Sequence, residues 1–259
     1  MRGDLGQIMD STKSNSSVAG AWAGATLRGP LATTNKTFDT VRFGFTSVRA
    51  RYRDNPGRML RCIDPFSLEK LIFSTPLQYE NWLLRRFDPA VIYLNSSRDS
   101  WEVLHHGHLL AIKPHLHWAG WSDRGVLEIV VEPGQEALFS SAEKLEIIAR
   151  TYHMRASLRL AAEVRSAPKL LDLLNRMRQR LVFHADIVRN ASVTEHVLQA
   201  VKSAPVVTRG DVMSACMGSA YDLTRDGVDA VLFWLRRVSG VQFDIEEGGY
   251  DDRTTITAA

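Results

Sequence analysis

The sequence has very little cysteine and no long hydrophobic run. Its 259 residues include only two cysteines, Cys62 and Cys216, which lie far apart along the chain. Two thiols cannot form a disulfide framework or a zinc ribbon, which favours a reducing compartment. No stretch approaches the roughly 20 apolar residues that cross a bilayer, and residues 18–25 are too short and interrupted for a signal-peptide core. We therefore expect a cytoplasmic protein without a membrane partner.

Signature motifs of several enzyme classes are missing as well. The sequence has no Gly-x-Ser-x-Gly nucleophile turn, no Walker phosphate-binding loop and no dinucleotide-binding fingerprint. It has no large excess of either charge, since 32 lysines and arginines against 29 acidic residues leave a net charge of +3. Such a charge permits a nucleic-acid partner without requiring one, so the local clustering of charge matters more.

The chain begins with a segment of low hydrophobicity, and a basic stretch follows it. Residues 1–36 are rich in Ser, Thr, Gly and Ala and have little to bury, so we expect them to be disordered. The basic stretch contains Arg49, Arg51 and Arg53 with few acidic neighbours. Two interpretations stay open, a solvated arm and an arm that contacts DNA phosphates.

Helical and strand patterns then alternate up to about residue 190. Residues 126–132 form a nearly continuous apolar run interrupted by Glu128, which is typical of a strand covered on both faces. This alternation predicts an α/β domain over residues 37–190, with a mixed sheet flanked by helices. The expected helices are 76–87, 142–153 and 168–183, and the expected strands are 91–94, 101–104, 109–114 (extended by 115–121), 126–132 and 157–162.

The pattern changes after Asn190 to three short helices and a hairpin, which predicts a winged-helix domain over residues 191–259. The expected helices cover 193–201, 209–217 (capped by Thr208) and a third segment from Asp222 or Thr224 to 238. A hairpin over 241–257 would form the wing. Because this wing is acidic, the domain could bind a protein as readily as DNA.

One helix and two strands carry a pattern related to metal-dependent nucleases. Those enzymes use a helix glutamate, an aspartate after proline and a Glu-x-Lys strand to hold Mg²⁺ and position water. Here the helix supplies Glu80, His115 follows Pro114 where aspartate would fit, and Glu132 stands where the lysine would fit. Glu80 taken alone could equally be a surface residue.

The segments around these residues follow one another in a familiar order. They are residues 76–84, 87–91, 113–115, 127–133 and 173–178. In order and spacing they resemble the TnsA-type endonuclease subunit of heteromeric transposases, over residues 70–256. The resemblance implies a restriction-endonuclease-like domain followed by a winged helix, with Mg²⁺ or Mn²⁺ as cofactor if the site is active. It also implies DNA, a DDE-type transposase and an AAA+ regulator as partners.

The resemblance also assigns positions in the active site. Glu80 corresponds to the helix glutamate, His115 to the aspartate and Glu132 to the lysine, while Val130 takes the place of the strand Glu or Gln. Glu80, His115 and Glu132 are thus the candidate catalytic residues. Losing the aspartate and the lysine together argues against hydrolysis, because imidazole is a poor ligand for Mg²⁺.

Two arrangements could still provide a metal site. A histidine and carboxylate site could bind Mn²⁺, Zn²⁺ or iron. Its candidate ligands are Glu80, His115 and His117, with Glu132 and the nearby His105, His106 and His108 in addition. Alternatively, a shifted register brings Glu128 rather than Glu132 into the site. The histidines could also be exposed and bind nothing.

We expect a transposition-associated protein, a degenerate endonuclease subunit that positions DNA or assembles a transposase. One alternative is an active endonuclease that cuts transposon ends, and another is a winged-helix regulator of a mobile element. The candidate DNA-binding residues are Arg49, Arg51, Arg53, Arg176, Arg178, Arg209 and Arg225.

Overall fold

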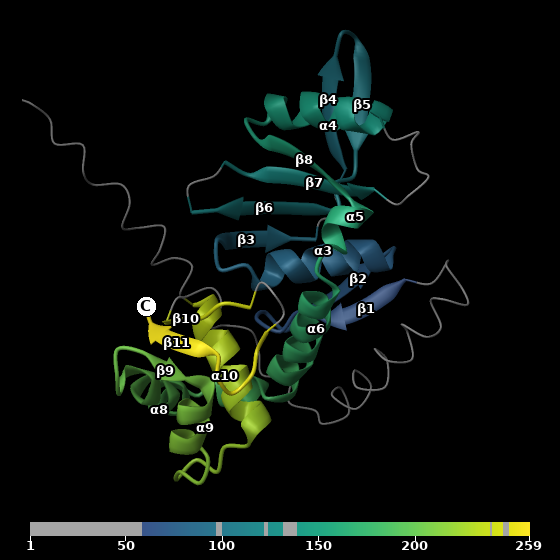
Figure 1. Ribbon diagram of the computed structural model, residues 1–259. Helices are drawn as coiled ribbons and strands as arrows, with labels where there is room; N and C mark the ends of the chain where they lie inside the picture. The colour runs from purple at the N-terminus through teal and green to yellow at the C-terminus, as the bar shows by residue number, and fades with distance from the viewer. Residues whose placement is uncertain (1–58, 97–99, 122–123, 132–138, 239, 246–248) are drawn as a thin grey trace, which may run out of the picture. The chain divides into compact units, whose positions relative to one another are not determined.

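A four-stranded mixed sheet organises the first part of the fold (Figure 1). The computed structural model describes residues 59–96, 100–121, 124–131, 139–238, 240–245 and 249–259, with the side chains of residues 139 and 140 left out. The strand order is β3-β6-β7-β8; β3, β6 and β7 are antiparallel to one another, and β8 runs parallel to β7. The strands are β3 (Val91–Asn95), β6 (Leu116–Gly120), β7 (Val126–Val131) and β8 (Arg155–Leu160).

Helices cover this sheet on both faces, as the sequence predicts. Helix α3 (Pro76–Phe87) packs against one face, where its Leu77 contacts Val130. Helix α4 (Phe139–Thr151) connects β7 to the parallel β8 and packs against the other face, where Leu127 and Ile129 meet its apolar side. Because side chains alternate along a strand, the apolar run of β7 supplies both cores.

The local signals that define α3 are clear in the sequence. The Thr75 hydroxyl accepts a hydrogen bond from the Gln78 amide, Pro76 occupies the first turn, and Arg85 and Arg86 lie in the last turn. These residues satisfy the helix ends and complement the helix dipole. The predicted bounds 76–87 are confirmed.

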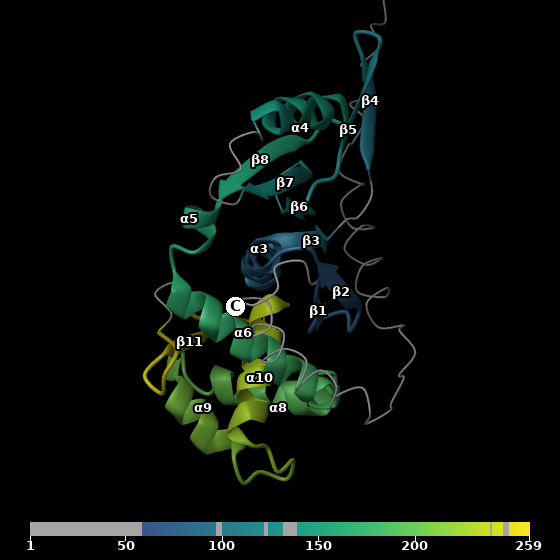
Figure 2. The same ribbon diagram turned by 90° about the vertical axis from the view of Figure 1, so that its right-hand side faces the viewer.

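Strands β4 (Trp101–His105) and β5 (His108–Ile112) form a separate hairpin that extends past α4 (Figures 1 and 2). His106 and Gly107 form its turn with positive φ angles of 49° and 77°, a conformation suited to a tight hairpin. The prediction that residues 115–121 extend the second strand is wrong. They contain β6, which pairs with β3 and β7, because Pro114 has no amide N–H to continue the ladder.

Another hairpin, β1 (Leu60–Ile63) with β2 (Lys70–Phe73), precedes α3 and was not predicted. Asp64 stabilises the loop between the two strands. Its carboxylate accepts a hydrogen bond from the Phe66 amide and forms an ion pair with Arg86 of α3. Short four-residue strands give too weak a period-2 signal to be read from the sequence. The hairpin contributes Leu60, Cys62 and Phe73 to the core.

The C-terminal part consists of short helices and a small antiparallel sheet. The sheet has the strand order β10-β11-β9. The third expected helix begins after its cap Thr224 and is α10. The elements are α5 (Ala161–Val164), α6 (Pro168–Phe183), α7 (Ala185–Val188), α8 (Ala191–Lys202), β9 (Val207–Thr208), α9 (Arg209–Cys216), α10 (Arg225–Arg237), β10 (Val241–Gln242) and β11 (Thr255–Ala258).

Helix α10 is enclosed by its neighbours. It contacts α6, α7 and α8, and eight of its thirteen residues are buried. One core cluster includes Val228 and Leu232 of α10 together with Leu174 of α6 and Trp82 of α3. The apolar core is thus continuous across residue 190. Within the described segments, no helix is long and apolar enough to cross a bilayer.

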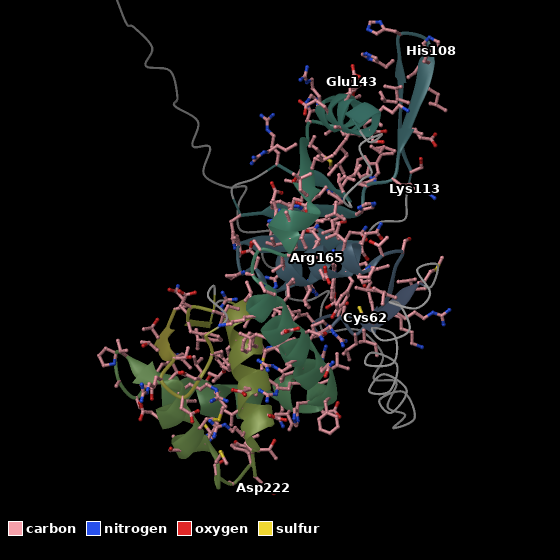
Figure 3. All side chains as sticks on the ribbon, turned by 45° about the vertical axis from the view of Figure 1, so that its right-hand side comes forward. Cys62, His108, Lys113, Glu143, Arg165 and Asp222 are labelled. Carbon is pink, nitrogen blue, oxygen red and sulfur yellow. The ribbon has the colours of Figure 1, made fainter. Side chains whose placement is uncertain are left out.

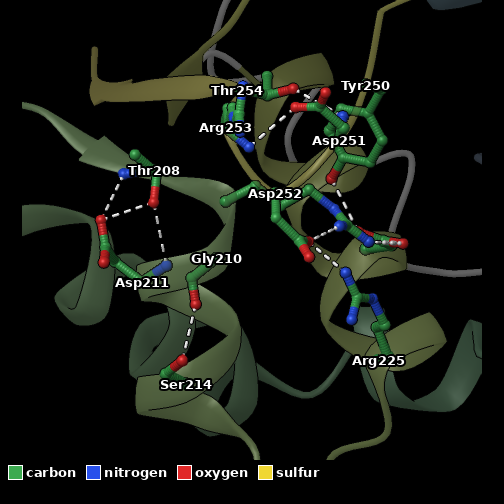
Figure 4. Close-up of polar contacts among 12 residues, drawn as sticks. Thr208, Gly210, Asp211, Ser214, Arg225, Tyr250, Asp251, Asp252, Arg253 and Thr254 are labelled. Atoms are coloured by element: carbon green, nitrogen blue, oxygen red, sulfur yellow. Dashed lines mark hydrogen bonds and ion pairs between the residues drawn. The ribbon is translucent and has the colours of Figure 1, made fainter.

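Buried charges join α9, α10 and the segment before β11 (Figure 4). The Asp229 carboxylate is fully buried and accepts two hydrogen bonds of 2.8 Å from the Arg209 guanidinium. Arg180 of α6 and the Tyr250 hydroxyl also donate to Asp229. Asp252 contacts Arg209 and Arg225 at the rim of this cluster.

Replacing Asp229 with alanine should destabilise the fold strongly. The substitution leaves the buried Arg209 without its main carboxylate partner, and removing one member of a buried pair costs about 3–5 kcal/mol. Urea unfolding followed by circular dichroism measures the change. The control is Arg150→Ala, which breaks an exposed pair with Glu146 and should cost roughly 0–1 kcal/mol. Equal effects of the two variants would contradict this assignment.

Candidate functional site

A buried carboxylate lies at the centre of the face covered by α3. Glu128, in the middle of β7, has no exposed surface. Its Oε1 accepts a 2.6 Å hydrogen bond from Asn81 Nδ2, and its Oε2 accepts a 2.6 Å hydrogen bond from Arg85 Nη2. Trp118 Nε1 and Ser157 Oγ also donate to Oε2, at 3.3 and 3.0 Å. The carboxylate therefore has its acceptor sites directed at protein donors.

These donors keep Glu128 ionised. Burial alone would raise the pKa of Glu128, but the hydrogen bonds and positive charge of Arg85, the Asn81 amide and the charge of Arg159 outweigh it, so the pKa is lowered. The Arg85 guanidinium also stacks over the Trp118 ring at 4.4 Å. A charge held in this way stabilises the packing of α3 on the sheet.

His115 lies next to this carboxylate along the backbone. Its amide donates a 2.8 Å hydrogen bond to the Glu128 carbonyl, and its Nδ1 accepts a 3.0 Å hydrogen bond from the Val130 amide. Burial lowers the pKa of His115 from 6.5 to about 4, against the opposing effect of the Glu128 charge. His115 is therefore neutral at pH 7, and one ring nitrogen is occupied by the strand backbone.

Glu80 and His117 lie apart from this pair. Glu80 forms a 2.7 Å ion pair with Arg165, just after α5. His117 pairs in register with Leu127, and therefore lies on the sheet face opposite Glu128, where its ring contacts Tyr93 and Trp101. Burial lowers the pKa of His117.

The structure does not gather the proposed metal ligands into one site. Among the described residues, no three His, Cys, Asp or Glu side chains lie close enough to hold a metal ion. His108 lies at the far end of the β4–β5 hairpin and Lys113 at its base (Figure 3). Glu132 lies outside the described residues. The His115 amide is bonded to the backbone carbonyl of Glu128, the residue of the alternative register.

Two of the arginines proposed to bind DNA are in the interior. Arg178 is fully buried, and its Nε donates to the Tyr79 hydroxyl. Arg209 is 6% exposed and bound to Asp229. This corrects their assignment as phosphate contacts, because both guanidinium groups are used in folding.

The other proposed DNA contacts differ in their availability. Arg176 is exposed on α6, and Arg225 is exposed at the start of α10 but paired with Asp252 (Figure 4). Arg49, Arg51 and Arg53 lie outside the described residues. Because α10 is covered by α6 and α8, it presents only its first turn and its last residues to solvent.

The sequence reasoning missed the residues that surround Glu128. Asn81 and Arg85 lie four positions apart on α3, which places them on one side of the helix. Ser157 and Arg159 lie two positions apart on β8, which places them on one face of the strand. That spacing could have been noticed. Their convergence on one carboxylate depends on the packing of α3 on the sheet, which spacing does not reveal.

Comparison with protein-family models gives no match, and comparison with curated protein sequences gives none either.

The neutral state of His115 should make stability depend on pH. In the unfolded chain the imidazole titrates near pH 6.5, and in the folded protein near pH 4. The stabilising contribution is therefore complete above pH 6.5 and is lost as the pH falls toward 4, with a full span on the order of 3 kcal/mol. The free energy of unfolding is measured by urea titration between pH 7 and pH 4.

His115→Gln should flatten the fall in stability over this pH range, because glutamine does not titrate there. The control is His108→Gln, on the exposed end of the β4–β5 hairpin, which should retain the wild-type slope. A slope that is unchanged in His115→Gln would rule out His115 as the cause.

Proposed function

We propose that this protein is a TnsA-like subunit of a transposition complex that has lost metal-dependent cleavage and acts by positioning DNA and assembling a DDE-type transposase with its AAA+ regulator. The observation that carries the proposal is the closed hydrogen-bonding shell of Glu128. A nuclease would need an open carboxylate at this place in the sheet.

The topology supports a restriction-endonuclease-like core. A helix, three antiparallel strands, a second helix and a parallel fourth strand follow one another as α3, β3, β6, β7, α4 and β8. The inserted β4–β5 hairpin leaves this order intact. The face of the sheet covered by α3 is the one on which the resemblance puts the active site, since the helix glutamate belongs to the same helix.

The side chains on that face argue against hydrolysis. The aspartate position is held by His115, whose Nδ1 is engaged by the backbone. The strand carboxylate is held by Arg85, and a guanidinium at hydrogen-bonding distance competes with any cation. Val130, which takes the place of the strand Glu or Gln, is buried, and its side chain has no carboxylate or amide group that could bind a metal ion.

The order of elements after residue 190 supports a winged helix. Helices α8, α9 and α10, with β9 between the first two and β10 and β11 after the third, follow the winged-helix pattern. In many such domains the third helix enters the major groove. Here α10 is covered by α6, and the positive charge of Arg225 in its first turn is paired with Asp252. Both features favour a role in assembly over sequence-specific DNA binding by this helix alone.

The proposal predicts that the purified protein does not nick supercoiled plasmid in the presence of Mg²⁺ or Mn²⁺, because the described residues bring no group of metal-binding side chains together. Agarose gels measure nicked and linear product over time. Glu80→Ala and Glu128→Gln serve as matched controls for contaminating nuclease. Metal-dependent nicking by the wild type that either substitution abolishes would refute the loss of cleavage.

The assembly role predicts a ternary complex. The protein should join a complex that contains transposon-end DNA and a DDE-type transposase. Native gels and mass photometry measure the assembly. Failure to join, together with sequence-specific binding to a promoter in the absence of transposase, would favour the regulator alternative.

A further inference from the structure

Arg159 of β8 is a half-buried cation that forms no ion pair with any carboxylate of the described residues. Its Nη1 donates one 2.7 Å hydrogen bond to Asn81 Oδ1. Within the described parts of the chain, no carboxylate forms a salt bridge with it. A guanidinium has five N–H donors in a planar fork, so most of its donors remain for a ligand.

The charges around Arg159 do not balance it. Glu128 is already bound by Arg85, and the exposed Glu163 accepts the Leu160 amide instead of pairing with Arg159. Burial and the positive charge of Arg85 lower the pKa of Arg159 more than Glu128 and Glu163 raise it. An anion bound between Arg85 and Arg159 would relieve both the repulsion and the loss of hydration.

The position of the pair makes it accessible. Arg159 is partly exposed, and the side chain of Arg85 is 21% exposed. A planar guanidinium matches the geometry of a phosphate in two-point hydrogen bonding.

We infer that Arg159 and Arg85 bind a phosphate group at the α3 face of the sheet without a metal ion, and that this phosphate belongs to a DNA backbone. The inference rests on the proposed function and deepens it. In the described geometry the two cations take over the charge neutralisation that metal ions provide in a nuclease, while Glu128 holds Arg85 in place. Such a site binds the DNA backbone and does not cleave it.

Arg159→Gln tests the site by binding rather than by cleavage. Fluorescence anisotropy with a labelled DNA duplex, in EDTA, should show an affinity about tenfold lower, because one charge-assisted contact is lost. The slope of log affinity against log salt should fall by about 1. Arg159→Lys keeps the charge and should retain part of the affinity. Arg150→Gln, which changes an exposed arginine of α4, is the matched control and should bind like the wild type.

A second measurement identifies the source of the phosphate and guards against misfolding. Inorganic phosphate should raise the melting temperature of the wild type above that in chloride of equal ionic strength, and this rise should be absent in Arg159→Gln. The melting temperature of Arg159→Gln in chloride shows that the variant is folded; if it is not, Arg159→Lys carries the comparison. Protection by phosphate with unchanged DNA binding would overturn the assignment to DNA.

Other outcomes separate this inference from the proposed function. Wild-type affinity and salt slope in Arg159→Gln would overturn the phosphate site and leave the loss of cleavage standing. Metal-dependent nicking, with DNA binding still weakened in Arg159→Gln, would refute the proposed function and support the site.

Discussion

The charged carboxylate of Glu128 constrains the arrangement of the whole sheet. A single ionised group inside an apolar strand is tolerated only when donors surround it. Asn81 and Arg85 must therefore face β7, which fixes the rotation of α3, and Ser157 must face it from β8, which fixes the register of the parallel pair. Any group that entered to use this carboxylate would have to displace those donors.

The same principle operates in the C-terminal part. Asp229 lies inside α10, and Arg209, Arg180 and Tyr250 reach it from three other segments. Burial lowers the pKa of Arg209, but its hydrogen bonds and the charge of Asp229 outweigh that effect and raise it. Arg209, which the sequence suggests for DNA binding, is therefore bound to a carboxylate inside the fold. Helix α10 is part of the core and is not exposed as a helix that could contact DNA bases.

The elements that could be predicted from the sequence are those that depend on interactions between residues close together in the chain. Helix α3, helix α6 and the cap Thr208 depend on local periodicity and local hydrogen bonds, and those predictions are confirmed. Of the two expected starts of the third helix, Asp222 and Thr224, the structure has Thr224 as the cap. The mixed sheet flanked by helices could be predicted as well, because the helical and strand patterns are each local and their order is visible in the sequence. What is local to a few residues can be predicted without knowing the partners.

The site could be predicted only in part, because its residues meet across long sequence separations. Arg85 reaches Glu128 over 43 positions and Arg159 reaches Asn81 over 78. A count of basic residues treats Arg178 and Arg176 alike, although one is buried and the other exposed. Whether an arginine binds a phosphate or a neighbouring carboxylate depends on packing, and packing is set by the whole fold.

The pairing of arginines with carboxylates limits which parts of the surface could bind DNA phosphates. Arg178 and Arg209 are bound in the interior and Arg225 is paired with Asp252, so three of the arginines proposed to bind DNA are held by the fold, while Arg176 stays exposed. The acidic residues near β11 add repulsion. On the sheet, Arg159 has no salt bridge among the described residues. A protein that holds DNA through such a cation gains affinity from charge but no sequence information, so its specificity must come from its partners. Such dependence on partners agrees with the proposed role, in which the subunit positions DNA without cutting it.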